Sequence, residues 1–341
     1  MLEVNNLKTF FRTQDGVVKA VDGVSFTLDA GETLGIVGES GSGKSVTALS
    51  IMQLNPSPPV EYPEGEILFE GQDLLKVSDK RMQEIRGNDI AMIFQDPMTS
   101  LNPVFTVGNQ IREAIRIHQN VSKSEAQEKT AQVLRDVGIA NPERMVKDYP
   151  HQFSGGMRQR AMIAMALSCN PKVLIADEPT TALDVTIQAQ ILELMVDLQE
   201  KYGTAIIMIS HDLGVVAQIA DKVMVMYAGR AVEQGTTDEV FYDPLMPYSW
   251  SLLRSLPRLD MAGEVRLLPI RGTPPSLIFL PEGCNFNPRC PFVKDECHEI
   301  DPDLEEKKPN HTAACILSID EIEAHKQRVD EELGLEGSAS A

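Results

Sequence analysis

Short apolar runs alternate with helical patterns from the start of the chain to about residue 255. The runs are rich in Val, Ile and Leu and are bounded by Gly or polar residues, which is typical of strands buried on both faces of a mostly parallel sheet. We predict such strands at Thr33–Val37, Glu66–Phe69, Ile90–Phe94, Val173–Ala176, Ala205–Ile209 and Val223–Tyr227. Helical patterns lie between them, the clearest at Ser45–Gln53, Glu125–Val137, Gly156–Ser168 and Thr186–Lys201. This alternation predicts an α/β domain.

Two segments depart from the alternation. From about residue 96 to residue 157 the apolar runs stop and the pattern is helical, which predicts a helical insertion. After Arg254 the chain becomes rich in proline, a composition that excludes long helices and predicts an irregular appendage. Residues 334–341 predict a frayed end. We therefore expect an α/β domain at residues 1–255 and a C-terminal extension at residues 256–341.

The net charge of the chain limits the kind of macromolecule that it is expected to bind. The 341-residue chain carries 31 Lys and Arg against 50 Asp and Glu, a formal charge of −19 at pH 7. Such a surface repels polyphosphate backbones, which argues against nucleic acid as a partner. No apolar run approaches the roughly 20 residues that cross a bilayer, and the N-terminus lacks the basic start and apolar core of a signal peptide. The sequence therefore predicts a cytosolic location.

A phosphate-binding motif follows the strand Thr33–Val37. Residues 38–45 read G-E-S-G-S-G-K-S, which matches G-x-x-x-x-G-K-[ST] between a strand and a helix, the context that this motif requires. The glycines let backbone N–H groups turn toward phosphate oxygens, and the helix adds its positive dipole. We expect Lys44 to neutralise the β- and γ-phosphates and Ser45 to ligate Mg²⁺. The residues expected to contact the nucleotide are Gly38, Ser40, Gly41, Ser42, Gly43, Lys44 and Ser45.

Two carboxylates end the strand Val173–Ala176. Acids at the end of a buried strand are suited to face a cation at the carboxyl edge of the sheet. Asp177 is then expected to hold Mg²⁺, through water, and Glu178 to orient or deprotonate an attacking water molecule. Taken alone, such a pair is more often a helix cap followed by a solvated charge. The phosphate loop upstream favours the cation site.

Further polar residues come at the ends of two other strands. His211 follows the strand Ala205–Ile209 and is suited to donate near a γ-phosphate, although an isolated His at a strand end is usually structural. The next residue, Asp212, is a candidate N-cap of the following helix. Gln95 follows the strand Ile90–Phe94, where an uncharged amide is able to contact water or Mg²⁺ and to shift with the insertion.

A second anion-binding pattern lies outside the phosphate loop. Residues 153–157 read F-S-G-G-M before a helical run, a second helix start of the kind that binds anions. From spacing alone, a plain helix cap is an equally good interpretation. The whole set, however, resembles the ATP-binding-cassette (ABC) ATPases, with Walker A at 38–45, Gln95, the signature at 153–157, Walker B at 173–178, the D-loop at 181–184 and His211.

The resemblance to the ABC ATPases implies a composite site. In this family two cassettes close head to tail, so that each ATP lies between one subunit's Walker A and its partner's signature. The resemblance therefore implies nucleotide contacts from Ser154, Gly155, Gly156 and Asp184. Phe11 is a candidate platform for the adenine, although a buried core Phe is nearly as good an interpretation. Phe153 and Met157 depart from the family's Leu and Gln, but the Ser and both glycines are kept.

Two stretches narrow the resemblance to the ATPases of oligopeptide and dipeptide permeases. They are Gln95–Pro103 and the tail, with R-G-T-P-P at 271–275 and C-N-F-N-P-R-C-P at 284–291. The resemblance implies an ATPase that powers import of di- and oligopeptides from the cytoplasmic face of the inner membrane. It further implies a second, homologous ATPase subunit as partner in a heterodimer, two membrane permease subunits, and a solute-binding protein that acts through the complex.

Other cargoes and other ABC classes are the alternatives. Similar ATPases import nickel complexes, glutathione or oligosaccharides, and the residues of this chain do not choose among these cargoes. A DNA-repair ATPase of this fold carries a long coiled coil between Walker A and the signature, and a translation factor carries two cassettes; this sequence has neither. Glu178 and His211 disfavour a binding module without hydrolysis.

Four of the five cysteines gather near the C-terminus, at Cys284, Cys290, Cys297 and Cys315, with the spacing C-x₅-C-x₆-C-x₁₇-C. In a reducing compartment such a group points to a metal before disulfides. The spacing lacks the paired C-x₂₋₄-C of structural zinc, and Cys290-Pro291 is similar to the end of ferredoxin motifs. Similar permease ATPases share this tail, and the resemblance implies a structural [4Fe–4S] cluster. The alternatives are zinc, with His298 or His311 as a substitute ligand, and free thiols or disulfides.

Overall fold

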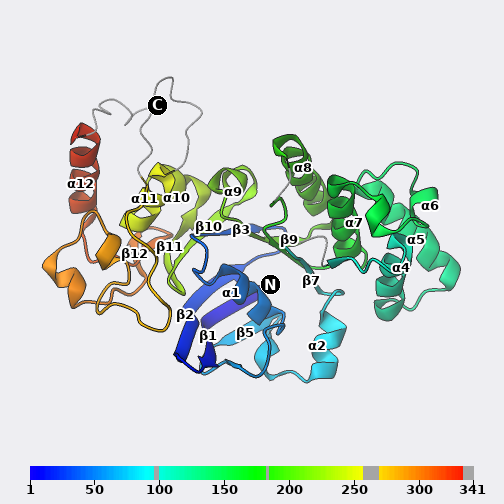
Figure 1. Ribbon diagram of the computed structural model, residues 1–341, viewed down its shortest axis with the longest axis horizontal. Helices are drawn as coiled ribbons and strands as arrows, with labels where there is room; N and C mark the ends of the chain where they lie inside the picture. The colour runs from blue at the N-terminus through cyan, green and yellow to red at the C-terminus, as the bar shows by residue number, and fades with distance from the viewer. Residues whose placement is uncertain (96–99, 182–183, 256–268, 333–341) are drawn as a thin grey trace.

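A computed structural model of the chain describes residues 1–95, 100–181, 184–255 and 269–332 (Figure 1). Four parts of the predictions lie outside these ranges: residues 96–99 of the helical insertion, Ala182 and Leu183 of the D-loop, residues 256–268 of the extension, and the 334–341 tail. Within them, no helix is both long and apolar enough to cross a membrane.

Within the described ranges, the larger sheet has eight strands in the order β12-β13-β11-β10-β3-β9-β8-β7. The last five strands in this order run parallel to one another. They are β10 (Lys222–Tyr227), β3 (Thr33–Val37), β9 (Ala205–Ile209), β8 (Val173–Asp177) and β7 (Ile90–Ile93). Every residue of β3, β8 and β9 is buried, as their unbroken apolar runs predicted. Because all five run the same way, their carboxyl ends, and the residues that follow them, meet at one edge.

A second, antiparallel sheet packs beside the first. It consists of β2 (Gly16–Leu28), β1 (Leu2–Thr13), β5 (Glu66–Phe69) and β6 (Gln72–Asp73), with β4 (Val60–Glu61) paired to β1. The prediction of a parallel strand at Glu66–Phe69 is therefore wrong in its sheet. These residues pair antiparallel with β1, and only alternate positions are fully buried. A run of four residues is too short to show this period.

Helices cover both ends of the larger sheet. The predicted helices are confirmed to within two residues at each end, as α1 (Lys44–Ile51), α5 (Lys123–Asp136), α7 (Gly155–Leu167) and α8 (Val185–Tyr202). The other α-helices of the described residues are α2 (Asp79–Ile85), α4 (Val107–His118), α6 (Pro142–Met145), α9 (Leu213–Ile219), α10 (Thr237–Tyr242), α11 (Pro247–Arg254) and α12 (Ile319–Glu332). In Figure 1, α4, α5, α6 and α7 form a helical group at one end of the molecule, apart from α1.

The C-terminal extension is built onto the larger sheet. Its strands β12 (Glu305–Lys308) and β13 (His311–Ala313) continue the sheet beyond β11 (Arg230–Thr236). Phe286 and Phe292 are each 1% exposed and belong to the same hydrophobic cluster as the residues beneath α7 and α8. The extension therefore gains its apolar core by packing on the rest of the chain. The 14-residue α12 follows the proline-rich stretch, where proline no longer opposes a helix.

Candidate active site

The loop from Gly38 to Gly43 joins β3 to α1 and depends on glycine. Gly38 has φ 147° and Gly43 has φ 106°, in the region that L side chains avoid. A Cβ at Gly38 would lie 2.2 Å from the carbonyl oxygen of Met226 on β10, and one at Gly43 would lie 2.4 Å from that of Ala20 on β2. Backbone carbonyl groups of β10 and β2 thus lie too close to Gly38 and Gly43 to leave room for a side chain at either position.

Lys44 begins α1 with its side chain folded over the loop. Its Nζ donates to the carbonyl oxygens of Gly38, at 2.8 Å, and of Glu39, at 3.0 Å. The residue is 6% exposed, and burial lowers its pKa although Glu178 and Asp177 oppose the shift. Since both acceptors are neutral carbonyls, the ammonium charge is suited to meet an anion at the helix N-terminus.

The hydroxyl and carboxylate predicted to hold Mg²⁺ lie together. Ser45 Oγ donates to Asp177 Oδ1 at 3.0 Å. Asp177 ends β8 and is 7% exposed; burial raises its pKa, and the bond from Ser45 opposes the shift. A carboxylate and a hydroxyl beside the phosphate loop are the hard oxygen donors that Mg²⁺ prefers, so these two residues fit that ion.

Glu178 lies at the centre of a polar cluster at the ends of β7, β8 and β9. Its carboxylate accepts from Gln95 Nε2 at 2.8 Å and from Thr181 Oγ1 at 3.0 Å, and His211 Nδ1 lies 3.1 Å from Oε1. Gln95 therefore contacts Glu178. The backbone of Glu178 has φ 48°, a strained conformation for a residue with a side chain, and its N–H donates to Ile209 O at 2.9 Å.

The charge of Glu178 is fixed by its donors. Burial acts to raise its pKa, but the hydrogen bonds from His211 and Thr181 together hold the pKa below its ordinary value. The carboxylate is therefore ionised at neutral pH. An ionised carboxylate beside a cation site is suited to take a proton from water.

The predicted signature and D-loop residues form helix caps within this chain. Ser154 Oγ accepts from Met157 N at 3.3 Å, and Gly155 and Gly156 make the first turn of α7. Asp184 Oδ1 accepts from Ile187 N at 3.0 Å at the start of α8. Asp212 caps α9 as predicted. The helical group with α7 lies apart from α1 in Figure 1, so the helix predicted to carry the signature and the helix after the phosphate loop are separated within one chain.

Phe11 lies near the end of β1, half-buried. It pairs with Val18 of β2 and with Val60 of β4. Phe11 therefore lies between two strands of the antiparallel sheet, with its side chain partly open to solvent.

The cysteines of the extension line one small cavity. Cys284, Cys290, Cys297 and Cys315, with Phe286, Phe292 and Leu317, surround a space of about 20 Å³, and none of the four is in a disulfide. Burial raises the pKa of Cys290 to about 12 and that of Cys315 to about 11. Across the described ranges no three His, Cys, Asp or Glu side chains are arranged as the ligands of a metal ion.

His311 does not line the cavity of the cysteines. Its Nε2 lies 2.8 Å from Glu233 Oε1, and both side chains are fully buried. Glu233 also accepts from Leu245 N and Met246 N. One ring nitrogen of His311 is therefore already engaged by Glu233. His298 is outside the lining as well.

Sequence reasoning missed one polar contact of the phosphate loop. Arg289, between two of the cysteines, contacts Glu39, the first variable position of the motif. No local signal reveals a pair separated by 250 positions.

Comparison with known proteins places these features in a family. Two family models match the chain. The one described as "ABC transporter" matches residues 21–181, and the one described as "Oligopeptide/dipeptide transporter, C-terminal region" matches residues 232–297. The oligopeptide transport ATP-binding protein OppD of Bacillus subtilis is 57% identical over 311 residues, which are 91% of this chain and 87% of the relative. The dipeptide transport ATP-binding protein DppD of the same organism is 55% identical over 317 residues, 93% of this chain and 94% of its own.

Solved structures agree with the fold. A dimeric ATP-binding cassette in a post-hydrolysis state, bound to ADP and Pi, matches with a TM-score of 0.63 and 26% identity over 70% of this chain and 99% of its own. The phosphate loop, the acidic end of β8 and this fold define an ABC ATPase, an enzyme that hydrolyses ATP. The chain belongs to the family of ATP-binding proteins of oligopeptide and dipeptide ABC transporters.

Proposed function

We propose that this chain powers the import of di- or oligopeptides, as a peripheral subunit on the cytoplasmic face of the inner membrane. The observation that carries the proposal is the similarity over 91% of the chain to an oligopeptide transport ATP-binding protein, with the C-terminal region included. In this proposal residues 1–255 form the ATPase domain and residues 256–341 an extension characteristic of peptide transporters. The helical insertion at about 96–157 transmits opening and closing to two membrane permease subunits.

The polar residues at the sheet edge divide the chemistry of ATP hydrolysis among them. Lys44 and the N–H groups of the loop bind the β- and γ-phosphates. Ser45 and Asp177 hold Mg²⁺, with Gln95 nearby, and the ion neutralises phosphate charge when bound. Glu178 takes the proton of the attacking water, and His211 donates toward the γ-phosphate. The hydrogen bonds of Ser45 to Asp177 and of Gln95 to Glu178 support this division.

A second ATPase subunit completes the site. Ser154, Gly155, Gly156 and Asp184 contact the nucleotide of the partner, while Phe11 stacks on the adenine bound to its own chain. Support comes from the separation of α7 from α1 within one chain and from the dimeric state of the solved relative. We propose a heterodimer with a homologous, non-identical ATPase, served by a solute-binding protein on the other side of the membrane.

Uptake by the assembled complex tests the cargo. The chain, its second ATPase and the two permease subunits are placed in vesicles with the solute-binding protein, and ATP-dependent accumulation of labelled di- and oligopeptides is measured. Glutathione, a nickel chelate and an oligosaccharide are the competing cargoes. Accumulation of peptides alone is the expected result. Accumulation of one of the others instead, or ATP-dependent efflux, contradicts the proposal.

We also propose a structural [4Fe–4S] cluster on Cys284, Cys290, Cys297 and Cys315. The support for it is the chemistry of the donors: four free thiols line one small cavity, although the described side chains are not arranged as the ligands of a metal ion. Backbone N–H groups donate to two of the sulfurs, from Phe292 to Cys290 at 3.4 Å and from Lys294 to Cys297 at 3.5 Å. Donors of this kind favour thiolate ligands, which apolar burial alone opposes.

Anaerobic purification with iron supplied tests the cluster. We expect a brown protein with iron and acid-labile sulfide in equal amounts, and loss of both in Cys290→Ser. Cys169→Ser is the matched control, because Cys169 is buried elsewhere and is not among the residues that line the cavity. A colourless protein with one zinc per chain contradicts the cluster.

A further inference from the structure

The extension contacts the phosphate loop through one buried ion pair. Arg289 Nη1 donates to Glu39 Oε2 at 2.6 Å, and Arg289 Nη2 donates to Glu39 Oε1 at 2.9 Å. The Arg289 side chain is 4% exposed and that of Glu39 is 26% exposed. A two-pronged pair of this kind fixes the direction of a carboxylate as well as its distance, and shielding from water strengthens it.

Other residues hold both ends of the pair in place. Arg289 Nε donates to Arg271 O at 3.1 Å, and Tyr248 Oη accepts from the backbone N–H of Glu39 at 2.9 Å. The rings of Tyr227, Tyr248 and Phe286 pack together, with centroids 4.6 Å to 5.3 Å apart. Phe286 belongs to the same cysteine-bearing loop as Arg289. This loop and the start of α11 therefore hold Glu39 from outside the ATPase motifs.

Glu39 connects the ion pair to Lys44, the lysine predicted to bind phosphate. Glu39 carries the side chain that Arg289 binds, and its carbonyl oxygen accepts from Lys44 Nζ at 3.0 Å. Movement of Glu39 would therefore move an acceptor of Lys44 and the adjoining N–H groups of the loop. We propose that Arg289 is a positioning residue for ATP binding, which acts through Glu39 on the phosphate loop. This inference rests on the proposed role of residues 38–45 in binding ATP.

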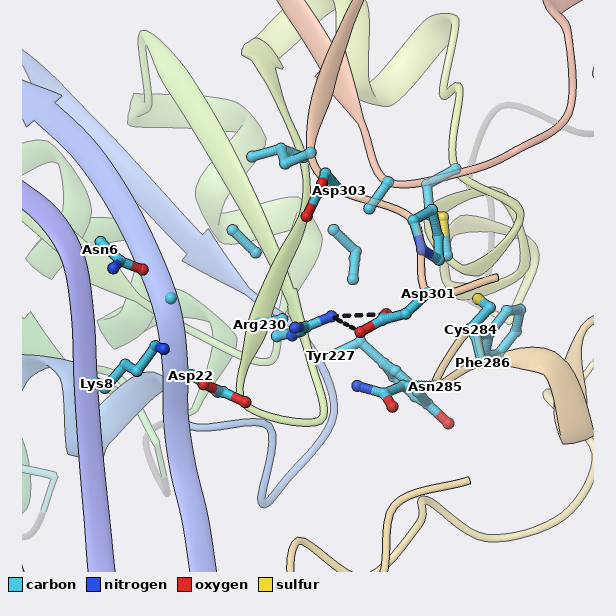
Figure 2. Close-up of a pocket in the computed structure, with 17 residues that line it drawn as sticks. Asn6, Lys8, Asp22, Tyr227, Arg230, Cys284, Asn285, Phe286, Asp301 and Asp303 are labelled. Atoms are coloured by element: carbon cyan, nitrogen blue, oxygen red, sulfur yellow. Dashed lines mark hydrogen bonds and ion pairs between the residues drawn. The ribbon is translucent and has the colours of Figure 1, made fainter. Parts of the chain in front are cut away.

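A purely structural role is the competing explanation, because Arg289 also fastens the extension to the rest of the chain. The chain offers a second ion pair as a control, with side chains 32% and 49% exposed against 4% and 26% in the Arg289–Glu39 pair. Arg230 of β11 donates to both carboxylate oxygens of Asp301 in the extension, at 2.7 Å each, and Figure 2 shows this pair across a cavity of about 200 Å³. This pair also joins the extension to the sheet, but neither residue is bonded to the phosphate loop.

Binding of Mg-ATP to the full-length chain, measured by calorimetry, tests the proposal. We expect Arg289→Met to weaken binding by about 3–30-fold, the range in which a residue outside the ligand contacts modulates affinity. Arg289→Lys keeps the charge but loses the fork, and should weaken binding less. Arg230→Met should bind Mg-ATP as the wild type does. Equal weakening in Arg230→Met and Arg289→Met, or unchanged binding in Arg289→Met, overturns the proposal.

A double-mutant cycle shows whether Arg289 acts through Glu39. Glu39→Gln and the uncharged pair Glu39→Gln with Arg289→Met are compared with the single variants, and circular dichroism checks that each folds. The double variant leaves no buried charge unpaired, which keeps the test usable if a single variant fails to fold. We expect that adding Arg289→Met to Glu39→Gln causes no further loss of affinity for Mg-ATP. A second, independent loss overturns the proposal.

Lys44→Ala separates this inference from the proposed nucleotide site. If Lys44→Ala binds Mg-ATP normally, the assignment of residues 38–45 fails and the inference fails with it. If Lys44→Ala loses binding while Arg289→Met keeps it, the nucleotide site stands and only the role of Arg289 is overturned.

Discussion

His211 Nδ1 lies 3.1 Å from Glu178 Oε1, although the two residues are 33 positions apart in sequence (211 minus 178). They meet because β8 and β9 are parallel neighbours whose carboxyl ends share one edge of the sheet. Gln95 joins them from β7, the next strand. The sheet order thus brings two predicted residues from separate motifs, Gln95 and His211, to the carboxylate of Glu178.

Removing His211 should move the acid limb of the pH–rate profile. His211 helps to hold the pKa of Glu178 below its ordinary value, so that Glu178 stays ionised as pH falls. Without this partner the pKa of Glu178 rises, and activity in His211→Ala is lost at a higher pH than in the wild type. ATPase rates of the assembled complex between mildly acidic and neutral pH provide the measurement. An acid limb that stays in place, or moves to lower pH, contradicts the coupling.

Asp177→Asn should raise the Mg²⁺ concentration that supports ATP binding. Asn keeps the size of the side chain but removes the charge beside Ser45, and loss of such a group typically costs about 10–100-fold in metal affinity. Nucleotide binding is titrated with Mg²⁺ at constant ATP. Binding without Mg²⁺ serves as the control and should change little. An unaltered Mg²⁺ dependence shows that Asp177 is not at the metal.

Two glycines of the phosphate loop should differ in their effect on stability. Gly38→Ala combines a strained φ of 147° with a Cβ 2.2 Å from Met226 O, whereas Gly41→Ala meets strain at φ 78° but no atom within 4 Å. Strain alone costs roughly 1–3 kcal/mol, so Gly38→Ala should be the more destabilising variant. Urea unfolding of both variants checks the order. Equal losses in the free energy of unfolding would mean that the carbonyl oxygen of Met226 on β10 does not restrict the side chain at position 38.

The active site could be predicted because its residues belong to short motifs, each contained in one local stretch of sequence. Residues 38–45 lie between a buried strand and a helix, and the acids at 177 and 178 end another buried strand, so their shared edge follows from a parallel sheet. The long strands β1 and β2 carry no comparable signal. Their side chains alternate between buried and exposed only in part, and the pairing of the two strands is broken by shifts in register.

Contacts between distant segments were beyond prediction. The composition of residues 256–341 shows an extension rich in proline and cysteine, but not that β13 would pair with β11 or that Arg289 would reach Glu39. Both depend on how the extension packs against the sheet. Glu66–Phe69 shows the same limit, since a four-residue apolar run fits either sheet.

The chain alone should hydrolyse ATP weakly. The helix α7 lies apart from α1, and under the proposed function a complete site would form only when a second ATPase closes on this chain. Adding the homologous subunit and the permease should raise the rate per chain. The dependence of specific activity on protein concentration, with and without the second subunit, is the measurement. Robust, cooperative activity of this chain by itself favours a homodimer and contradicts the heterodimer.

The most direct test of the account is the turnover of Glu178→Gln in the assembled complex. Gln keeps the shape of the side chain but cannot accept the proton of the attacking water, and loss of a positioned base typically costs about 10²–10⁴-fold in rate. Lys44 and Ser45 are unchanged in this variant, so Mg-ATP should still bind with the affinity of the wild type. The account predicts retained ATP binding with hydrolysis nearly abolished. ATP hydrolysis within a few-fold of the wild-type rate would contradict it.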